Sequence, residues 1–331
     1  MQAILMSQTG GTEVLQLQEM PTPVISTPTD VLVKLKAAGV NPVDTKIRRG
    51  LYPPKQLPTI PGCDGAGIVA EAGTAVTRYQ RGDEVYFFHG GIGAGPGNYA
   101  EYIVLDERFI ARKPANIDFA QAAALPLVFI TAWEALYDRA RMQAGHTLLI
   151  HAGAGGVGHI AIQLAKAAGA RVCTTISSDE KAKFVKQLGA DCVINYRKDN
   201  FVDAVMRWTD GVGVDIAMDN VGGELIQATF PAVRHRGDLV TLLQVPEKID
   251  WTIARMRNLR FSFEIMLTPL LFNLVDAQKH QTWIMEQCTR LVEDNKITIY
   301  VSEVLPLAQA ARAHQKIESG STTGKIVLKT D

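Results

Sequence analysis

The segment Thr147-Leu-Leu-Ile-His-Ala-Gly-Ala-Gly-Gly-Val-Gly158 carries most of the information about how this 331-residue chain folds. Residues 147–150 predict a buried parallel strand, and apolar residues recur at helical spacing from 157 to 168. Three glycines with the G-x-G-x-x-G spacing join the two elements: Gly153, Gly155 and Gly158. The first permits a tight turn, the second lets a diphosphate approach the backbone, and the third lets helix and strand pack closely. In this context a dinucleotide site is favoured over a purely structural turn, because the helix start offers free N–H groups.

The next strand, residues 171–176, bears on which dinucleotide is bound. An NAD site places a carboxylate at the end of this strand, to accept hydrogen bonds from the ribose hydroxyls. Here Ser177 follows the strand and Lys181 comes one turn later, and both donate to a phosphate, so the pattern favours NADPH. Asp179 and Glu180 weaken that argument because they lower the local positive charge. A capping box, with Ser177 as the cap and Glu180 reaching back, is the competing interpretation.

Strand and helix patterns alternate from about residue 125 to 265, which predicts an α/β fold with a doubly wound parallel sheet. The predicted strands are 147–152, 171–176, 192–196, 214–218, 237–243 and 259–265. The predicted helices are 157–168, 178–188, 200–208 and 223–234.

The first 120 residues have a different pattern of short apolar segments bounded by proline and glycine, which predicts a β-rich, barrel-like domain. After residue 265 a helix at 276–295 and strands at 297–301 and 325–329 are expected to return to this domain. The predicted domains are therefore 1–124 (catalytic), 125–265 (cofactor-binding) and 266–331 (completing the first). The cofactor is expected in the cleft between them.

Composition excludes several classes of function. Thirty-four basic and thirty-four acidic residues give a formal net charge of +0, which does not favour a nucleic-acid or anionic-membrane partner. No apolar run reaches membrane-spanning length, and residues 1–6 do not resemble a signal peptide. The four cysteines show no C-x-x-C pair and are expected to be reduced thiols of a cytoplasmic protein.

Several further segments together resemble the medium-chain dehydrogenase/reductase superfamily, and within it the zinc-independent, zeta-crystallin-like quinone oxidoreductases. They are Ala38-Gly-Val-Asn-Pro-Val-Asp44, Ile47-Arg-Arg-Gly-Leu-Tyr52, Ile60-Pro-Gly-Cys-Asp-Gly-Ala-Gly67, Leu125 to Leu136, Val193-Ile-Asn-Tyr196 and Gly324-Lys-Ile-Val-Leu328. The resemblance covers essentially the whole chain. It implies a Rossmann domain, a GroES-like barrel domain and a homodimer that pairs the 259–265 edge strands.

A catalytic zinc ion needs three protein ligands. The resemblance places Asn41 where zinc-dependent members have a metal cysteine, and Cys63-Asp64 where they have a histidine and a glutamate. Residues 125–132 contain neither cysteine nor histidine, so we expect no metal site.

The resemblance also implies individual roles. Asn41 and Thr131 would line the nicotinamide, Asn41 also facing the substrate, and the alternative for Asn41 is a turn residue before Pro42. The residues implied at the diphosphate are Gly155, Gly156, Val157 and Gly158, and those at the 2′-phosphate are Ser177, Lys181 and Tyr196. Tyr196 has an alternative as an aromatic residue that packs on the sheet.

Three residues remain. Asn220 fits a contact to the ribose or nicotinamide at the strand ends. Lys325 would close over the cofactor or stand on the solvated surface. Tyr52 would donate a proton to the product anion or form a hydrophobic wall, and solvent is the other proton source.

The function expected is NADPH-dependent reduction of a quinone or an α,β-unsaturated carbonyl compound by direct hydride transfer. Two alternatives stay open. One is a zinc-independent alcohol or enoyl-thioester reductase on the same scaffold, and the other is a non-catalytic NADPH-binding protein. Substrate profiling distinguishes the alcohol or enoyl-thioester reductase from the expected function. Cofactor binding without oxidation by any acceptor would identify the non-catalytic protein.

Overall fold

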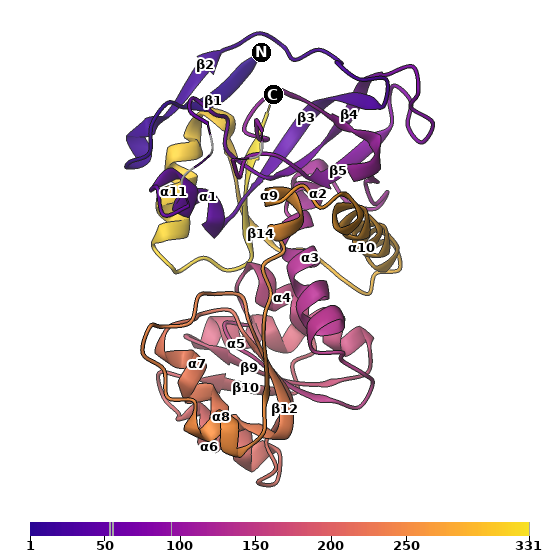
Figure 1. Ribbon diagram of the computed structural model, residues 1–331. Helices are drawn as coiled ribbons and strands as arrows, with labels where there is room; N and C mark the ends of the chain where they lie inside the picture. The colour runs from indigo at the N-terminus through magenta and orange to yellow at the C-terminus, as the bar shows by residue number, and fades with distance from the viewer. Residues whose placement is uncertain (53, 55, 94, 331) are drawn as a thin grey trace. The chain divides into compact units, whose positions relative to one another are not determined.

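The computed structural model describes residues 1–52, 54, 56–93 and 95–330. The chain forms two compact units (Figure 1). The first contains Met1–Ile130 together with Leu267–Asp331, and the second contains Thr131–Met266.

The second unit is built on a six-stranded parallel sheet with the order β10-β9-β8-β11-β12-β13. Its strands are β8 (Thr147–Ile150), β9 (Arg171–Ile176), β10 (Cys192–Asn195), β11 (Val214–Asp219), β12 (Val233–Thr241) and β13 (Arg260–Phe263). The order reverses between β8 and β11, as in a doubly wound fold. The α/β prediction is confirmed.

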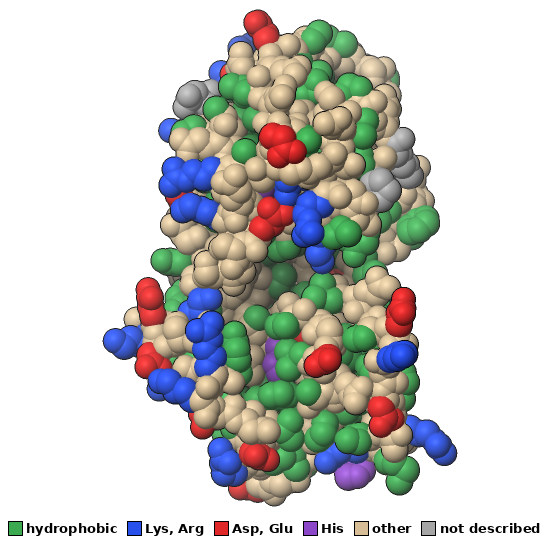
Figure 2. Space-filling view, turned by 90° about the vertical axis from the view of Figure 1, so that its left-hand side faces the viewer, with side chains coloured by type: hydrophobic (Ala, Val, Ile, Leu, Met, Phe, Trp, Pro, Cys, Tyr) green, Lys and Arg blue, Asp and Glu red, His purple; other side chains and the backbone are tan. Residues whose placement is uncertain are grey.

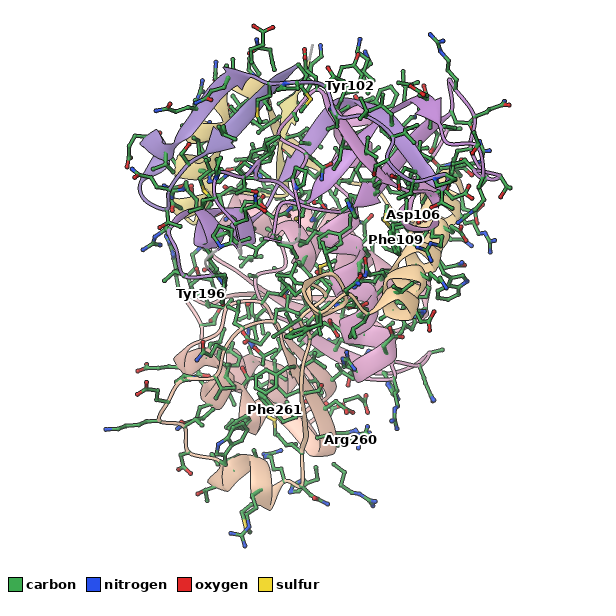
Figure 3. The ribbon with its side chains drawn as sticks, turned by 45° about the horizontal axis from the view of Figure 1, so that its top comes forward. Tyr102, Asp106, Phe109, Tyr196, Arg260 and Phe261 are labelled. Carbon is green, nitrogen blue, oxygen red and sulfur yellow. The ribbon has the colours of Figure 1, made fainter. Side chains whose placement is uncertain are left out.

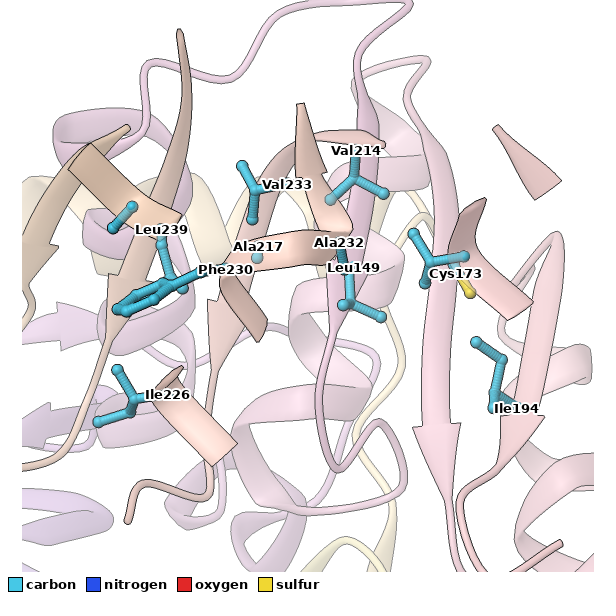
Figure 4. Packing of buried hydrophobic residues seen from close by; sticks show 12 residues of the cluster. Leu149, Cys173, Ile194, Val214, Ala217, Ile226, Phe230, Ala232, Val233 and Leu239 are labelled. Carbon is cyan, nitrogen blue, oxygen red and sulfur yellow. The ribbon is translucent and has the colours of Figure 1, made fainter. Parts of the chain in front are cut away.

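Helices cover both faces of this sheet. They are α4 (Gly156–Ala167), α5 (Asp179–Gln187), α6 (Phe201–Trp208), α7 (Glu224–Thr229) and α8 (Thr252–Met256). Helices α4 and α5 lie on one face, and α6, α7 and α8 lie on the other (Figure 1). Figure 4 shows the apolar core beneath this second group, where Leu149, Ala217 and Leu239 of the strands meet Ile226 and Phe230.

One predicted helix, 223–234, is too long. Helix α7 ends at Thr229, a 3₁₀ turn spans Phe230–Ala232, and β12 begins at Val233. Pro231 lacks the N–H that an α-helix would need at this point, so the helix cannot continue.

The first unit contains a sheet with the order β14-β15-β3-β4-β5-β7, to which β6 adds by pairing with β3. Its strands are β3 (Asp30–Val40), β4 (Asp64–Ala72), β5 (Glu84–Phe88), β6 (Tyr102–Asp106), β7 (Ala111–Arg112), β14 (Val301–Pro306) and β15 (Lys325–Lys329). Strand β15 runs antiparallel to β3 with Ile326 opposite Val40, so residues from both ends of the chain form one sheet. A separate hairpin consists of β1 (Gln2–Met6) and β2 (Leu15–Glu19).

The predicted strand at 297–301 is wrong. Strand β14 starts at Val301, although Ile297 and Ile299 are buried. Residues 297–300 therefore have the alternating burial of a strand but do not pair with a neighbouring strand.

The helices of the first unit are α1 (Pro42–Arg48), α2 (Phe119–Ala123), α9 (Thr268–Leu271), α10 (Val275–Glu293) and α11 (Ala310–Glu318). Helix α3 (Pro126–Trp133) leads into the second unit and continues as a π-helical segment, Glu134–Arg139. Further 3₁₀ turns span Thr12–Val14, Glu107–Phe109 and Leu307–Gln309. Among the described residues, no helix combines the length and apolarity that a membrane span requires.

Candidate active site

The glycine segment forms a sharp turn between β8 and α4, with Gly155 as the N-cap of the helix. A side chain at Gly153 would place its Cβ 2.0 Å from Thr174 Oγ1, and one at Gly158 would place it 2.3 Å from the Ala152 carbonyl oxygen. Both positions therefore require glycine so that α4 can pack onto the strands. Gly156 and Val157, which begin α4, are half-buried. The turn exposes main-chain N–H groups at a helix N-terminus, which is a suitable place for a diphosphate.

The ends of β9 and β10 bring Ser177 and Tyr196 together. The Tyr196 N–H donates to the carbonyl of Ile176, the residue before Ser177, at 3.1 Å. Tyr196, labelled in Figure 3, is 53% exposed. Lys181 lies in the first turn of α5 and is half-buried. A hydroxyl, a phenol and an ammonium group thus stand at or near the two strand ends.

The capping interpretation of Ser177 is wrong. Ser178 is the N-cap of α5, and its hydroxyl accepts a hydrogen bond from the Lys181 N–H at 3.3 Å. The extended backbone of Ser178 suits this role. Ser177 therefore does not serve as the cap.

The acidic residues after Ser177 are partly neutralised. Lys198 Nζ lies 2.9 Å from Asp179 Oδ1, and this contact holds the pKa of the Asp179 carboxyl below its usual range. Asp179 therefore has a salt bridge, whereas Glu180 has none among the described residues. The negative charge beside Lys181 is consequently smaller than the sequence suggests.

Asn220 follows β11 and offers an unsatisfied acceptor. Its Nδ2 donates to the His151 carbonyl at 2.8 Å. Its Oδ1 is buried and has no hydrogen-bond partner in the described part of the chain. Buried polar atoms are nearly always paired, so Oδ1 fits a donor from a bound ligand such as a ribose hydroxyl or a carboxamide.

Two polar residues near the glycine turn were missed by the sequence reasoning. The His151 ring lies between the Thr175 and Thr229 hydroxyls, at 3.1 and 3.0 Å, and burial lowers its pKa to about 4. The imidazole is therefore neutral and structural. The Asp219 carboxylate accepts from the N–H groups of Val221 and Gly222 and fixes the turn that carries Asn220.

In the first unit a buried polar cluster surrounds Asn41, the N-cap of α1. Asn41 Nδ2 donates to Asp64 Oδ2 at 2.8 Å, and Lys325 Nζ donates to Asn41 Oδ1. The same ammonium donates to the Val40 carbonyl at 3.1 Å and lies 3.7 Å from Asp64 Oδ2. Both ends of the Asn41 amide are thereby engaged, so its orientation is fixed. Lys325 is 3% exposed, which corrects the alternative of a solvated surface lysine.

Asp44 extends this cluster toward α11. Its Oδ2 accepts from the Asn41 N–H at 2.8 Å and from the Tyr99 hydroxyl at 3.0 Å. The Tyr99 oxygen also lies 3.3 Å from His314 Nε2. Burial raises the pKa of Asp44 to about 7, and burial lowers that of His314 to about 3. His314 is therefore neutral at physiological pH, whereas the Asp44 carboxyl titrates close to physiological pH.

These residues do not fit a zinc ion. The Cys63 thiol accepts from Asn41 Nδ2 at 3.7 Å and lies 3.9 Å from Asp44 Oδ1. Burial, together with the charges of Asp44 and Asp64, raises its pKa well above the usual value. Asp64 already pairs with the Lys325 ammonium. Among the described residues, no group of three histidine, cysteine or acidic side chains could hold a metal.

The remaining predicted residues lie in different surroundings. Thr131 is buried in α3, at the first position of the second unit. Tyr52 is 51% exposed after α1, with the Lys46 ammonium 6.0 Å from the centre of its ring.

Sequence reasoning found Asn41 and Lys325 but not the residues that hold them. Asp44 is detectable from its spacing, since Asn41 and Asp44 stand at the cap and third positions of a helix that starts with Pro42. Asp64, Tyr99 and His314 have no comparable local pattern, because only the folded sheet and α11 bring them together.

Comparisons with known proteins agree with this architecture. The alcohol dehydrogenase GroES-like domain matches residues 27–115, and a family model described as zinc-binding dehydrogenase matches residues 188–328. The quinone oxidoreductase of Pseudomonas aeruginosa is 35% identical over 319 residues, which is 96% of each chain. The chloroplastic NADPH-dependent alkenal/one oxidoreductase of Arabidopsis thaliana is 34% identical over 99% of this chain and 79% of its own length.

Among solved structures, Escherichia coli quinone oxidoreductase complexed with NADPH covers 100% of both chains, with 31% identity and a TM-score of 0.89. The chain belongs to the medium-chain dehydrogenase/reductase superfamily and, within it, to the quinone oxidoreductase family. It is accordingly an oxidoreductase that uses a nicotinamide cofactor.

Proposed function

We propose that this protein is an NADPH-dependent reductase of quinones or α,β-unsaturated carbonyl compounds that works without a metal ion in the cytoplasm. The observation that carries the choice of cofactor is the group of donors at the ends of β9 and β10. Ser177 and Tyr196 lie there, Lys181 lies in the first turn of α5, and Lys198 pairs with the Asp179 carboxylate. A 2′-phosphate is stabilised by such donors and repelled by the carboxylate that an NAD site carries.

NADPH, when bound, would supply the hydride. The protein would supply the groups that bind NADPH. The N–H groups of Gly156, Val157 and Gly158 at the start of α4 would bind the diphosphate. Gly155, whose own N–H donates to the Ala152 carbonyl at 2.9 Å, would let the diphosphate approach the backbone, and Gly153 allows the turn. Asn220 Oδ1 would accept a hydrogen bond from the ribose or the carboxamide. Asn41, Thr131 and Lys325 are assigned to the nicotinamide end, where the fixed Asn41 amide would orient substrate and ring.

The acceptor becomes an anion when it receives a hydride, either a hydroquinone anion or an enolate. Tyr52 is exposed, so its hydroxyl can reach a ligand and donate a hydrogen bond or a proton to that oxygen. Solvent is the second proton source, and an anion of this kind needs no strong acid. The names of the relatives, quinone oxidoreductase and NADPH-dependent alkenal/one oxidoreductase, support these two acceptor classes.

A steady-state comparison tests the proposal. Purified protein is assayed with NADPH and with NADH against one simple quinone and one enone, with a chelator present. We expect turnover with NADPH and a KM for NADPH well below that for NADH. Absence of turnover across a wide acceptor panel, or a preference for NADH, contradicts the proposal. Tight NADPH binding without oxidation by any acceptor would indicate the non-catalytic alternative.

Lys181→Ala separates the phosphate contact from the rest of the site. We expect the KM for NADPH to rise about tenfold and the KM for NADH to stay unchanged, because a charge-assisted hydrogen bond is worth about 1.5–3 kcal/mol. Lys183→Ala is the matched control, since Lys183 is an exposed lysine of the same helix. Equal effects of the two substitutions would show that Lys181 does not contact the cofactor.

A further inference from the structure

Two cysteines that are separated in the sequence are direct neighbours in the folded sheet. Cys173 of β9 and Cys192 of β10 are paired in register on adjacent parallel strands. Residues so paired point to the same face of a sheet. Cys173 belongs to the buried apolar cluster of the second unit, labelled in Figure 4, and Cys192 packs against that cluster. The other two cysteines, Cys63 and Cys288, are buried in the first unit.

The spacing of the strands permits a bond between the two sulfur atoms. Adjacent strands lie about 4.8 Å apart, and the Cα atoms of a disulfide are usually about 4.4–6.8 Å apart. Strand β10 is the edge strand of its sheet and pairs with no strand other than β9. An edge strand can shift slightly to bring the Cβ atoms closer, because it is hydrogen-bonded to a neighbouring strand on one side only.

The two thiols differ in accessibility and in acidity. Cys192 is half-buried and Cys173 is fully buried, so a small oxidant reaches Cys192 first. The neighbouring thiol of Cys173 lowers the pKa of Cys192, and the thiol of Cys192, together with burial, raises that of Cys173. The thiolate is the reactive form of a cysteine. Cys192 is therefore the nucleophile of the pair.

We propose that Cys173 and Cys192 are a redox-sensitive dithiol that closes to a reversible disulfide when a peroxide reaches the edge of the sheet. The Cys192 thiolate attacks the peroxide, its O–O bond breaks, and a sulfenic acid and an alkoxide or hydroxide form. The Cys173 sulfur then attacks the sulfenic sulfur, the S–O bond breaks, and the S–S bond forms. The proton of the Cys173 thiol leaves with the hydroxyl group as water. A thiol reductant returns both sulfur atoms to thiols.

The test uses the full-length protein and hydrogen peroxide. Reduced, desalted protein is treated, unfolded, alkylated and mapped by mass spectrometry. We expect alkylatable thiols to fall from four to two per chain, with a linked peptide pair that contains Cys173 and Cys192. Cys63 and Cys288 serve as internal controls that stay alkylatable. Dithiothreitol should restore all four thiols.

Two variants keep the proposal falsifiable, with circular dichroism as the check that each is folded. Cys173→Ala should halt the reaction at a Cys192 sulfenic acid that dimedone traps, and Cys192→Ser should abolish both products. Four thiols remaining in the wild type would overturn the proposal. So would cross-linking between chains, or equal dimedone trapping in the wild type and Cys173→Ala. The readout needs no NADPH or acceptor and is independent of the proposed enzymatic activity.

Discussion

Among single residues, Lys325 has the most demanding environment. It is an almost fully buried ammonium that contacts the Asn41 amide, the Val40 carbonyl and the Asp64 carboxylate. A buried charge is tolerated only when it is paired and hydrogen-bonded, and removal of one partner leaves the other uncompensated. Lys325 and Asp64 therefore depend on each other.

Replacing this lysine should destabilise the protein. We expect Lys325→Met to lower the free energy of unfolding by about 3 kcal/mol, because the Asp64 carboxylate loses its counter-charge. Urea unfolding measures the change. Lys329→Met is the matched control, since Lys329 ends the same strand and is exposed. A double variant, Lys325→Met with Asp64→Asn, should recover part of the loss. If Lys325→Met unfolds like the Lys329 control, the ion pair does not stabilise the fold.

Asp44 should make stability depend on pH. Its pKa is about 7 in the folded protein, against an ordinary value of 3.8, so the folded state holds the proton more tightly than the unfolded chain. Stability from this group is therefore largest at acid pH and falls as the pH rises toward 7. Asp44→Asn removes that dependence.

We expect the free energy of unfolding of Asp44→Asn, relative to that of the wild type, to rise by on the order of 1 kcal/mol per pH unit between about pH 5 and 7. Above about pH 7 this difference should become constant. Urea unfolding at a series of pH values measures the difference. Asp210→Asn is the control, because Asp210 is exposed in a turn with a φ of 52° that asparagine also adopts. A difference from wild type that does not vary with pH would contradict the raised pKa.

At the level of secondary-structure elements, the turn between β8 and α4 combines packing and binding. Gly158 lets the helix approach the turn, whereas Gly155 caps the helix with an extended backbone that any residue adopts. The fold therefore requires glycine at position 158, whereas the proposed ligand requires it at position 155.

Alanine substitutions should separate them. Gly158→Ala places Cβ 2.3 Å from the Ala152 oxygen and should lower the free energy of unfolding by about 2 kcal/mol. Gly155→Ala places Cβ at 3.2 Å from the same atom and should change stability by less than about 0.5 kcal/mol. It should still weaken NADPH binding, because a methyl group blocks the approach of the diphosphate. Urea unfolding and fluorescence titration give the two readouts. Equal stability of both variants would contradict this division.

Considered as a whole molecule, the protein carries as many basic as acidic residues. Its formal net charge is +0, and Figure 2 shows basic and acidic side chains scattered among each other on the face in view. A more specific feature is the edge strand β13, which pairs with β12 and carries Arg260 and Phe261, labelled in Figure 3. Phe263 and Ile265, in and just after this strand, are 50% and 52% exposed. Exposed strand edges with apolar side chains favour pairing with another chain.

We propose that β13 pairs with its copy in a homodimer. Light scattering after size-exclusion chromatography should give twice the chain mass of 36.1 kDa at micromolar concentration. Phe263→Glu should produce a monomer, because a carboxylate cannot be buried unpaired in the interface. Val304→Glu is the control, since Val304 is an exposed apolar residue on the edge strand β14. A monomeric wild type, or a dimer that survives Phe263→Glu, would contradict the proposal.

Local patterns predicted the parallel sheet and the glycine turn well. Strand β9 has the predicted bounds, and α4 begins within one residue of its predicted start. Hydrophobic periodicity, glycine spacing and strand composition are properties of residues that are close in the sequence, so they can be recognised without knowing the fold. The competing capping interpretation placed the cap at Ser177 rather than Ser178, since two adjacent serines give the same pattern.

Contacts between distant segments were accessible only in the folded protein. Lys325 meets Asn41, 284 positions away in the sequence, because β15 pairs with β3. Cys173 meets Cys192 because β9 and β10 are paired in register. Local residue patterns specify strands and turns through backbone sterics and hydrophobic periodicity. Which buried charges and thiols become neighbours depends on strand order and register, and these are fixed only when the whole core packs.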